Sequence, residues 1–189
     1  AYLTNQLLLK KLETIAHTDG LTGLYNRYYF KQEFDEANDR FEKFGIHYSL
    51  LVADANGLKP VNDNYGHEAG DRFLIEIAEC LKAVSRKTDV VARMGGDEFS
   101  VLMPDSDQSG GEYLIERIRE YCEGRVIEIP DHDSVPLSMS LGFASTDGCS
   151  ADLISKTADD AMYADKEEYY KTHKKQRKGN LFYSLLKTC

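Results

Sequence analysis

The feature that most constrains the fold is a pair of glycines set between two short apolar runs. Gly95 and Gly96 separate the run at residues 89–93 (DVVAR) from the run at residues 98–103 (EFSVLM). Two strand-like segments joined by a glycine turn are typical of an antiparallel β-hairpin. The chain must therefore build a sheet around this hairpin, and helical patterns on both sides of it supply the covering layers.

The order of the predicted elements defines the fold class. Without its first two helices the chain reads β-α-β-β-α-β, which is the ferredoxin-like or palm-like arrangement. We therefore expect an α+β fold, an α/β sandwich with a central mixed sheet flanked by helices, in which strands joined by crossover helices run parallel. Strands are expected at 46–56, 89–93, 98–103, 125–129, 135–145 and, as a last edge strand, 180–186; helices at 28–45, 72–85, 108–124 and 151–178; and a polar loop at 57–71.

The N-terminal residues 1–17 are predicted to form a separate helix. Ala1, Leu8 and Ile15 are spaced by seven residues, as heptad positions of a coiled coil are. This helix either packs on its own domain or connects residues 18–189 to an upstream domain. Because the chain begins without Met, we expect it to be a fragment.

The overall charge argues against a nucleic-acid partner. The chain has 23 Lys and Arg against 32 Asp and Glu, a net charge of −9, which would repel a phosphate backbone. No apolar run is long enough to cross a membrane, and we expect no membrane contact by this domain. The cysteines match no zinc pattern and favour a reduced, cytoplasmic setting, in a free protein or in the cytoplasmic part of a membrane-anchored one. They are Cys80, Cys122, Cys149 and Cys189.

Three acids are expected to meet at one edge of the sheet. Asp54 ends the first core strand, while Asp97 and Glu98 lie in the hairpin turn. Carboxylates brought together repel one another, and a divalent cation such as Mg²⁺ or Mn²⁺ relieves that repulsion. A cation held in this way commonly binds phosphates, which points to phosphoryl or nucleotidyl transfer. Without a side chain, Gly95 and Gly96 would let a phosphate or sugar approach the backbone.

Five segments together resemble the GGDEF family, the diguanylate cyclases. The resemblance covers about residues 16–170. The motifs that carry it are DGLTGLYNR at 19–27, DANGLKPVNDNYGHEAGD at 54–71, GGDEF at 95–99, SMSLGFA at 138–144 and ADDAMYADK at 158–166.

The resemblance implies a reaction, a metal site and a partner. The family condenses two GTP into cyclic di-GMP and two pyrophosphates, with one GTP in each half of a transient homodimer. Its metal ligands and catalytic acids fall on Asp54, Asp97 and Glu98. One of the two hairpin acids would hold Mg²⁺ or Mn²⁺, and the other would lie near the ribose 3′-hydroxyl. We favour Glu98 as the ligand, although the sequence does not separate the two roles.

The same resemblance implies the substrate-binding residues. Guanine recognition falls on Asn62 and Asp71, and adenine would leave these polar groups unpaired. Lys59 and Lys166 match positions that contact the triphosphate, where a mobile point charge is suited to phosphate. Gly95 and Gly96 belong to the same substrate site. Taken alone, the polar residues would be read as loop and helix-cap residues and the lysines as surface lysines.

A second nucleotide site is implied by Arg86 and Asp89. They form an RxxD motif at the offset from GGDEF at which the family binds cyclic di-GMP as an inhibitor. An Arg can bind the O6/N7 edge of guanine with two hydrogen bonds, and an Asp can accept from its N1/N2 edge. Outside this context an RxxD motif usually marks a helix end.

Two departures from the family pattern leave alternatives open. Asn56 replaces a second Asp, and Tyr170 stands where an Arg commonly reaches a phosphate. The first hypothesis is an active cyclase, with residues 18–189 as its GGDEF catalytic domain. The resemblance then implies the output module of a bacterial-type signalling protein, whose N-terminal sensory domain is missing from this fragment. The second is a catalytically weak receptor or scaffold for GTP or cyclic di-GMP. A third is another metal-dependent nucleotidyltransferase on a similar sheet, which a comparison of GTP with ATP would distinguish.

Overall fold

The fold is built on a five-stranded sheet in the order β1-β3-β4-β2-β7. The computed structural model describes residues 16–130, 132 and 134–186. A separate two-stranded sheet is formed by β5 and β6. The strands are β1 (Tyr25–Asn26), β2 (Tyr48–Ala55), β3 (Val90–Gly95), β4 (Glu98–Pro104), β5 (Val126–Ile127), β6 (Val135–Pro136) and β7 (Met139–Ser145).

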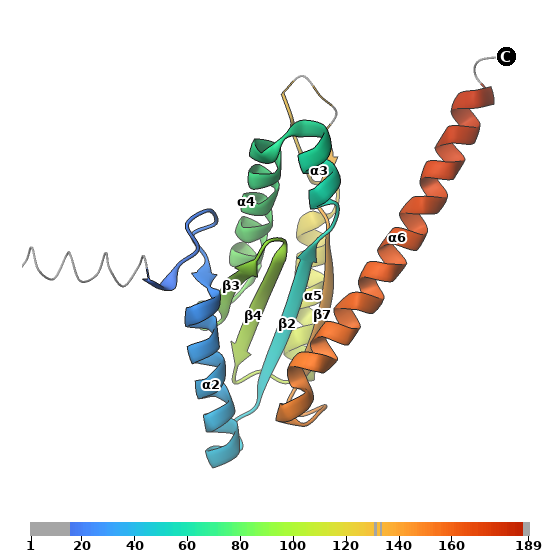
Figure 1. The fold of residues 1–189 in the computed structure, drawn as a ribbon. Coiled ribbons are helices and arrows are strands. Elements are labelled where there is room, and N and C mark those ends of the chain that lie inside the picture. The colour runs from blue at the N-terminus through green and yellow to red at the C-terminus, as the bar shows by residue number, and fades with distance from the viewer. Residues whose placement is uncertain (1–15, 131, 133, 187–189) are drawn as a thin grey trace, which may run out of the picture.

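Helices cover both faces of the main sheet (Figure 1). On one face lie α2 and α6, and on the other lie α4 and α5. Within the described ranges, no helix combines the length and the apolar character needed to cross a bilayer. The helices are α2 (Arg27–Phe44), α3 (Leu58–Tyr65), α4 (His67–Val84), α5 (Gln108–Cys122), the 3₁₀ turn η1 (Ala151–Leu153) and α6 (Ile154–Leu186).

The strand pairing confirms the predicted fold class. The core order β3-β4-β2-β7 is that of a ferredoxin-like sheet, and its neighbouring strands pair antiparallel. Strands joined by crossover helices run in the same direction: β2 with β3, and β4 with β7. In each case another strand lies between the two, so these parallel strands are not hydrogen-bonded to each other. The neighbouring strands that do pair in parallel are β1 and β3.

Alternation along β2 divides the core into two layers. Leu51 and Ala53 pack with residues of α4 and α5, whereas Tyr48 and Leu50 pack with residues of α2 and α6. Successive side chains of a strand point to opposite faces, so a strand covered on both faces is apolar along its length. Asp54 falls on the same face as Tyr48 and Leu50, toward α6.

The segment predicted as a polar loop, residues 57–71, is mostly helical. It contains α3 and the first turn of α4. Leu58, Val61 and Tyr65 have helical spacing, and Val61 is buried in the core. The loop prediction was wrong because the Gly, Pro, Asn and Asp residues of this segment outweighed a short apolar pattern.

Two strand predictions also need correction. The segment 135–145 is not one strand, because the chain passes from β6 in the small sheet to β7 in the main sheet between Pro136 and Met139. Residues 180–186 are not an edge strand but continue α6. A short apolar run does not by itself distinguish a strand from a helix. The predicted N-terminal helix falls on residues 1–15, outside the described ranges.

Helix α6 lies directly against strand β7 at Gly142. A Cβ atom at this position would lie 2.2 Å from the carbonyl oxygen of Ala158 and 2.2 Å from the amide nitrogen of Met162. Both contacts are with helix backbone, which cannot move aside as a flexible side chain can. Glycine at position 142 therefore sets how closely α6 approaches the sheet.

We predict that Gly142→Ala destabilises the fold by about 1–3 kcal/mol, because the added methyl group must push α6 away from β7. The measurement is the free energy of unfolding in urea. Gly20→Ala is the matched control, since a Cβ atom there would meet no heavy atom within 4 Å. Equal stability of the two variants would contradict the assigned contact.

Candidate active site

The three acids gather at one end of the sheet. Asp54, near the end of β2, is paired in register with Glu98, the first residue of β4. Asp97 lies in the turn before Glu98, and its carbonyl oxygen accepts a hydrogen bond of 3.0 Å from the amide of Ala55. Asp54 is buried, Asp97 is partly exposed and Glu98 is exposed. The expected juxtaposition of strand and hairpin is thus formed by the backbone.

Lys166 brings a positive charge to the buried acid. Its Nζ lies 2.7 Å from Oδ2 of Asp54, and the two side chains are 27% and 7% exposed. Although partial burial opposes it, the hydrogen bond and charge of Asp54 raise the pKa of Lys166 above its ordinary value. Lys166 is therefore a fully charged partner of Asp54 at neutral pH.

One oxygen of Asp54 is left without a partner. Oδ1 of Asp54 is buried and accepts no hydrogen bond from the described residues. Burial raises the pKa of Asp54, the negative charge of Asp97 raises it further, and Lys166 only partly opposes this. A buried carboxylate oxygen with no donor is costly, and a hard cation is one partner that satisfies it.

The acids do not yet form a complete metal cage. Among the described residues, no group of three or more His, Cys, Asp or Glu side chains is arranged to hold a metal ion. The unpartnered oxygen of Asp54 and the adjacent acids nevertheless fit a divalent cation. Oxygen donors are also the ligands that Mg²⁺ and Mn²⁺ prefer.

The hairpin turn depends on both of its glycines. Gly95 and Gly96 have φ angles of 142° and 55°. Residues other than glycine rarely adopt such positive φ angles. The register between β3 and β4 shifts at this point, between Arg93 and Gly95. The glycines therefore give the turn its shape, and a Cβ atom at either position would meet no heavy atom within 4 Å.

Arg93 and Asp19, which the sequence analysis did not single out, hold this turn in place. Two guanidinium nitrogens of Arg93 donate to the carbonyl oxygen of Gly96, at 3.1 and 2.7 Å. A third donates to Oδ1 of Asp19, at 3.3 Å. Asp19 also accepts from the amide and hydroxyl of Thr22. An Asp followed by Thr three residues later is a local turn signal that could have identified Asp19.

Asp165 is a second residue that the sequence analysis missed. Its Oδ2 accepts a hydrogen bond of 2.9 Å from the amide of Leu141 in β7, and its Oδ1 lies 2.9 Å from the guanidinium of Arg119 in α5. These contacts fix α6 one residue before Lys166. Asp165 thereby helps to place the lysine over Asp54.

The residues expected to bind guanine come from two helices in contact. The side chain of Asn62, in α3, lies against Gly70 of α4, where a Cβ atom would come within 1.9 Å of Oδ1 of Asn62. Asp71 follows Gly70 and is exposed. The structure thus brings Asn62 beside the helix turn that carries Asp71. Lys59 is exposed in the first turn of α3, which begins three positions after β2 ends.

Asn56 is already used within the protein. It is 3% exposed. Its Nδ2 donates to the hydroxyl of Ser138 at 3.1 Å, and its Oδ1 accepts from the hydroxyl of Ser140 at 2.9 Å. Both partners lie at or beside the start of β7. The amide therefore ties β2 to this segment.

Arg86 and Asp89 lie at the opposite end of β3 from the glycine turn. The amide of Arg86 donates to Oδ2 of Asp89 at 2.7 Å, and burial raises the pKa of Asp89. Oδ1 of Asp89 is buried and has no hydrogen-bond partner in the part of the chain that the structure describes. Both residues line a cleft of about 400 Å³ that also contains Tyr25, Lys82 and Lys87.

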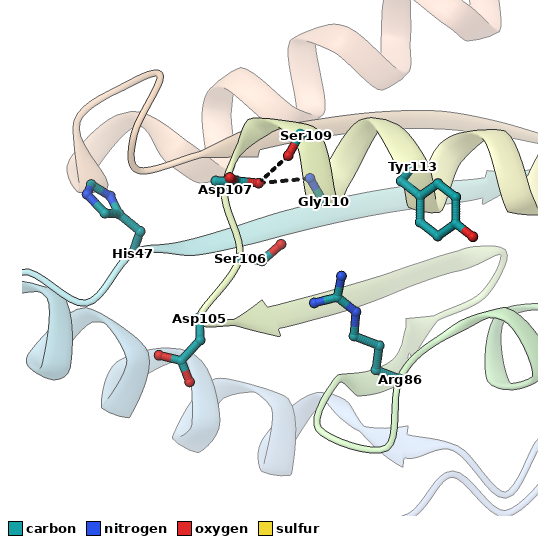
Figure 2. Close-up of a pocket in the computed structure, with 8 residues that line it drawn as sticks. All are labelled: His47, Arg86, Asp105, Ser106, Asp107, Ser109, Gly110 and Tyr113. Atoms are coloured by element: carbon teal, nitrogen blue, oxygen red, sulfur yellow. Dashed lines mark hydrogen bonds between the residues drawn. The ribbon is translucent and has the colours of Figure 1, made fainter.

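Arg86 also borders a second cleft, of about 470 Å³ (Figure 2). The acids of this cleft have structural partners. Asp107 caps α5 by accepting from the hydroxyl of Ser109 and the amide of Gly110, at 2.7 and 3.0 Å. Asp105 lies 3.5 Å from the guanidinium of Arg40. The acids of this cleft therefore serve as a helix cap and an ion-pair partner.

Comparison with known proteins identifies the family. The family profile described as "Diguanylate cyclase, GGDEF domain" matches residues 16–172. This chain belongs to the GGDEF family. The GGDEF chain is 35% identical to diguanylate cyclase DgcM of Escherichia coli over 162 residues, and 32% identical to probable diguanylate cyclase DgcT of the same organism. These matches cover 85% and 84% of this chain but only 38% and 35% of the relatives' own lengths.

Solved structures support the same assignment. The coiled coil and GGDEF domain of DgcB from Caulobacter crescentus, in complex with c-di-GMP, superposes with a TM-score of 0.78 at 30% identity. The superposition covers 88% of this chain and 89% of the DgcB chain. Diguanylate cyclase SiaD from Pseudomonas aeruginosa, in complex with its activator SiaC, gives a TM-score of 0.76 at 28% identity, over 88% of this chain and 64% of that one.

We predict that Arg93→Met raises the pKa of Asp19. Although burial opposes it, hydrogen bonds from Thr22 and the charge of Arg93 now hold that pKa below 3.8. A lowered pKa stabilises the fold above the unfolded-state value, and this stability is lost as the pH falls through the folded-state pKa. The free energy of unfolding of the variant should therefore fall less than that of the wild type when the pH is lowered from neutral to acid.

The measurements are the NMR titration of the Asp19 carboxyl carbon and urea unfolding over the same pH range. Arg40→Met is the control, because Arg40 contacts the exposed Asp105 instead. An Asp19 titration that is the same in the wild type and in Arg93→Met would show that the ion pair does not form.

Proposed function

We propose that this chain is the catalytic domain of a diguanylate cyclase, which condenses two GTP into cyclic di-GMP with release of two pyrophosphates. The observation that carries the proposal is the strand pairing of Asp54 with Glu98, next to Asp97. One buried carboxylate oxygen of Asp54 has no hydrogen-bond partner among the described residues. The names of the GGDEF relatives support the same reaction.

Asp54 and Glu98 would hold a divalent cation, Mg²⁺ or Mn²⁺, with Asp97 beside them. The cation would neutralise charge on the transferring phosphate, which is the main catalytic contribution available to such a site. Asp97 would accept the proton of the ribose 3′-hydroxyl. Gly95 and Gly96 would let the sugar and phosphates approach the backbone of the turn.

The two helices beside the acids would bind the rest of GTP. Asn62 and Asp71 would pair with the guanine edge, where a carboxylate accepts from N1–H and N2–H₂. Lys166 would move from Asp54 to the triphosphate, and Lys59 would add a second mobile charge. On the edge where guanine presents N1–H and N2–H₂, adenine has an unprotonated N1 and no amino group at C2. Asn62 and Asp71 would be left unpaired, so ATP should be rejected.

The reaction would need two copies of the domain. Each copy holds one GTP, and each 3′-hydroxyl must attack the α-phosphate of the other nucleotide. We therefore propose a transient homodimer acting in the cytoplasm as the output module of a longer signalling protein. The chain spans little more than a third of the two curated relatives, which leaves room for an upstream sensory domain in proteins of that length.

Arg86 and Asp89 would form the inhibitory product site. Arg86 is exposed beside a cleft, and one buried carboxylate oxygen of Asp89 has no partner within the described ranges. The related DgcB structure in complex with c-di-GMP supports a nucleotide role for this family. Product held here would keep two domains apart or in an unproductive orientation.

A second function, as a receptor or scaffold for GTP or cyclic di-GMP, is favoured by two observations. Tyr170 contributes no positive charge to the surface near Lys166, and Lys171 lies 3.2 Å from Glu167, on the exposed helix surface. The amide of Asn56 is occupied by Ser138 and Ser140. A domain with weak triphosphate binding could retain guanine recognition while turning over slowly.

We predict that Glu98→Gln and Asp54→Asn each reduce turnover about a hundredfold or more while the domain stays folded. Each change keeps the size of the side chain and removes one negative charge from the site. The measurement is cyclic di-GMP formed from GTP and Mg²⁺ or Mn²⁺, quantified by chromatography at several protein concentrations. Wild-type specific activity should rise steeply with concentration and vanish with a chelator.

Glu112→Gln is the matched control, because Glu112 accepts from Gln108 on the exposed surface of α5. Wild-type turnover in both site variants would show that the acids are only turn residues. If the wild type binds GTP but forms no product at high concentration, the receptor function replaces the cyclase.

We predict that Asp71→Ala weakens GTP binding by about 1.5–3 kcal/mol, the range for a hydrogen bond to a charged group. Calorimetry should also show that the wild type prefers GTP to ATP. Glu79→Ala, which removes the same charge from an exposed position of α4, should leave GTP affinity unchanged. Equal wild-type affinity for the two nucleotides would reject the guanine site and favour a different nucleotidyltransferase.

A further inference from the structure

Two cysteines that have no part in the proposed reaction lie in contact between α4 and α5. Cys80 lies four residues before the end of α4 and Cys122 is the last residue of α5, and their sulfur atoms are 4.0 Å apart. Both are free thiols. They are 42 residues apart in sequence, and the packing of α4 against α5 on the same face of the sheet brings them together (Figure 1).

The two thiols differ in their access to solvent. Cys80 is fully buried in the apolar core, whereas Cys122 is partly exposed. Cys122 also lines a cleft of about 390 Å³ together with Arg119, Leu137 and Met139. A small oxidant can therefore reach Cys122, while Cys80 is protected from solvent but remains in contact with Cys122.

We propose that Cys122 is a site of reversible oxidation by hydrogen peroxide, and that Cys80 is its resolving partner. Paired thiols of this kind, one reachable and one adjacent, are the arrangement of redox-sensitive cysteines. Oxidation then links α4 to α5 by a disulfide that a dithiol reductant opens again.

The chemistry balances in two steps. The thiolate of Cys122 attacks one peroxide oxygen, the O–O bond breaks, and the other oxygen leaves and takes up a proton as water, so that Cys122 becomes a sulfenic acid. The sulfur of Cys80 then attacks the sulfur of Cys122, the S–O bond breaks, and hydroxide leaves with the Cys80 proton as a second water. Two thiols and one peroxide thus give one disulfide and two waters.

The surroundings of Cys122 favour its thiolate. The hydrogen bond from Cys80 lowers the pKa of Cys122, and the positive charges of Arg125 and Arg119 lower it further, although burial opposes them. Arg125 is held nearby, with its guanidinium 3.8 Å from the ring centroid of Tyr121. The thiolate is the form that reacts with peroxide.

The geometry requires only a small closure. A disulfide has a sulfur–sulfur distance of about 2.05 Å, so the two atoms must approach by about 2 Å. Cys122 ends its helix and is followed by Gly124, which has a φ angle of 68°. The residue that must move therefore lies at a helix end, and Cys80 need not leave the core.

The test uses the whole chain, reduced and then exposed to hydrogen peroxide. Free thiols should fall from four to two per chain. Peptide mapping without reductant should recover Cys80 linked to Cys122, and dithiothreitol should restore all four thiols. The Cys149→Ser variant is the control and should form the same link.

In Cys80→Ala, the sulfenic acid of Cys122 should persist and be trapped by dimedone, several-fold faster than any adduct at Cys149. Recovery of other cysteine pairs, or of sulfinic acid at Cys122 with Cys80 still reduced in the wild type, would overturn the proposal. So would the absence of oxidation at Cys122 under conditions that oxidise Cys149. The wild-type peptide map decides the matter even if Cys80→Ala fails to fold.

Discussion

The closeness of α6 to β7 is the constraint on which the site depends. Because residue 142 is glycine, the helix backbone rests on the strand at Ala158 and Met162. Lys166 lies one helical turn beyond Met162 and so shares its face. The ammonium group of Lys166 therefore lies 2.7 Å from the carboxylate of Asp54, a residue of β2, the strand next to β7. A packing requirement on one strand therefore determines the electrostatics of the next.

The hairpin imposes a second constraint, which is conformational rather than steric. A turn with two glycines at positive φ has little stiffness of its own, since glycine loses more conformational freedom on folding than other residues do. Arg93 compensates by bonding the carbonyl of Gly96 and the carboxylate of Asp19 at once. The entry segment before α2 is thereby connected to the acids, although it lies far from them in sequence.

The sequence allowed the sheet to be predicted, and with it the meeting of Asp54 and Glu98. Strand alternation and a glycine turn are local signals, and the order of elements then restricts the topology. The helix α3 was missed because only Leu58, Val61 and Tyr65 carry its pattern among many turn-forming residues. The ion pair of Lys166 with Asp54 could not be derived from spacing, since it depends on the approach of α6. The tie from Arg93 to Asp19 is likewise a tertiary contact between segments that are distant in sequence.

The pair of Asp54 and Lys166 explains how an acidic site can exist before its substrate arrives. A buried carboxylate left alone is strongly destabilising, and removing one partner of a buried pair commonly costs about 3–5 kcal/mol. Lys166 supplies the missing positive charge, yet Oδ1 of Asp54 still has no hydrogen-bond partner among the residues that the structure describes. In the proposed reaction, a cation would take over the carboxylate and the lysine would turn to the triphosphate, so the charge of Asp54 would have a positive partner at both stages. Tyr170 adds no positive charge beside Lys166 for that second role, so, among the residues whose side chains the structure describes, the triphosphate would rely on Lys166, Lys59 and the metal.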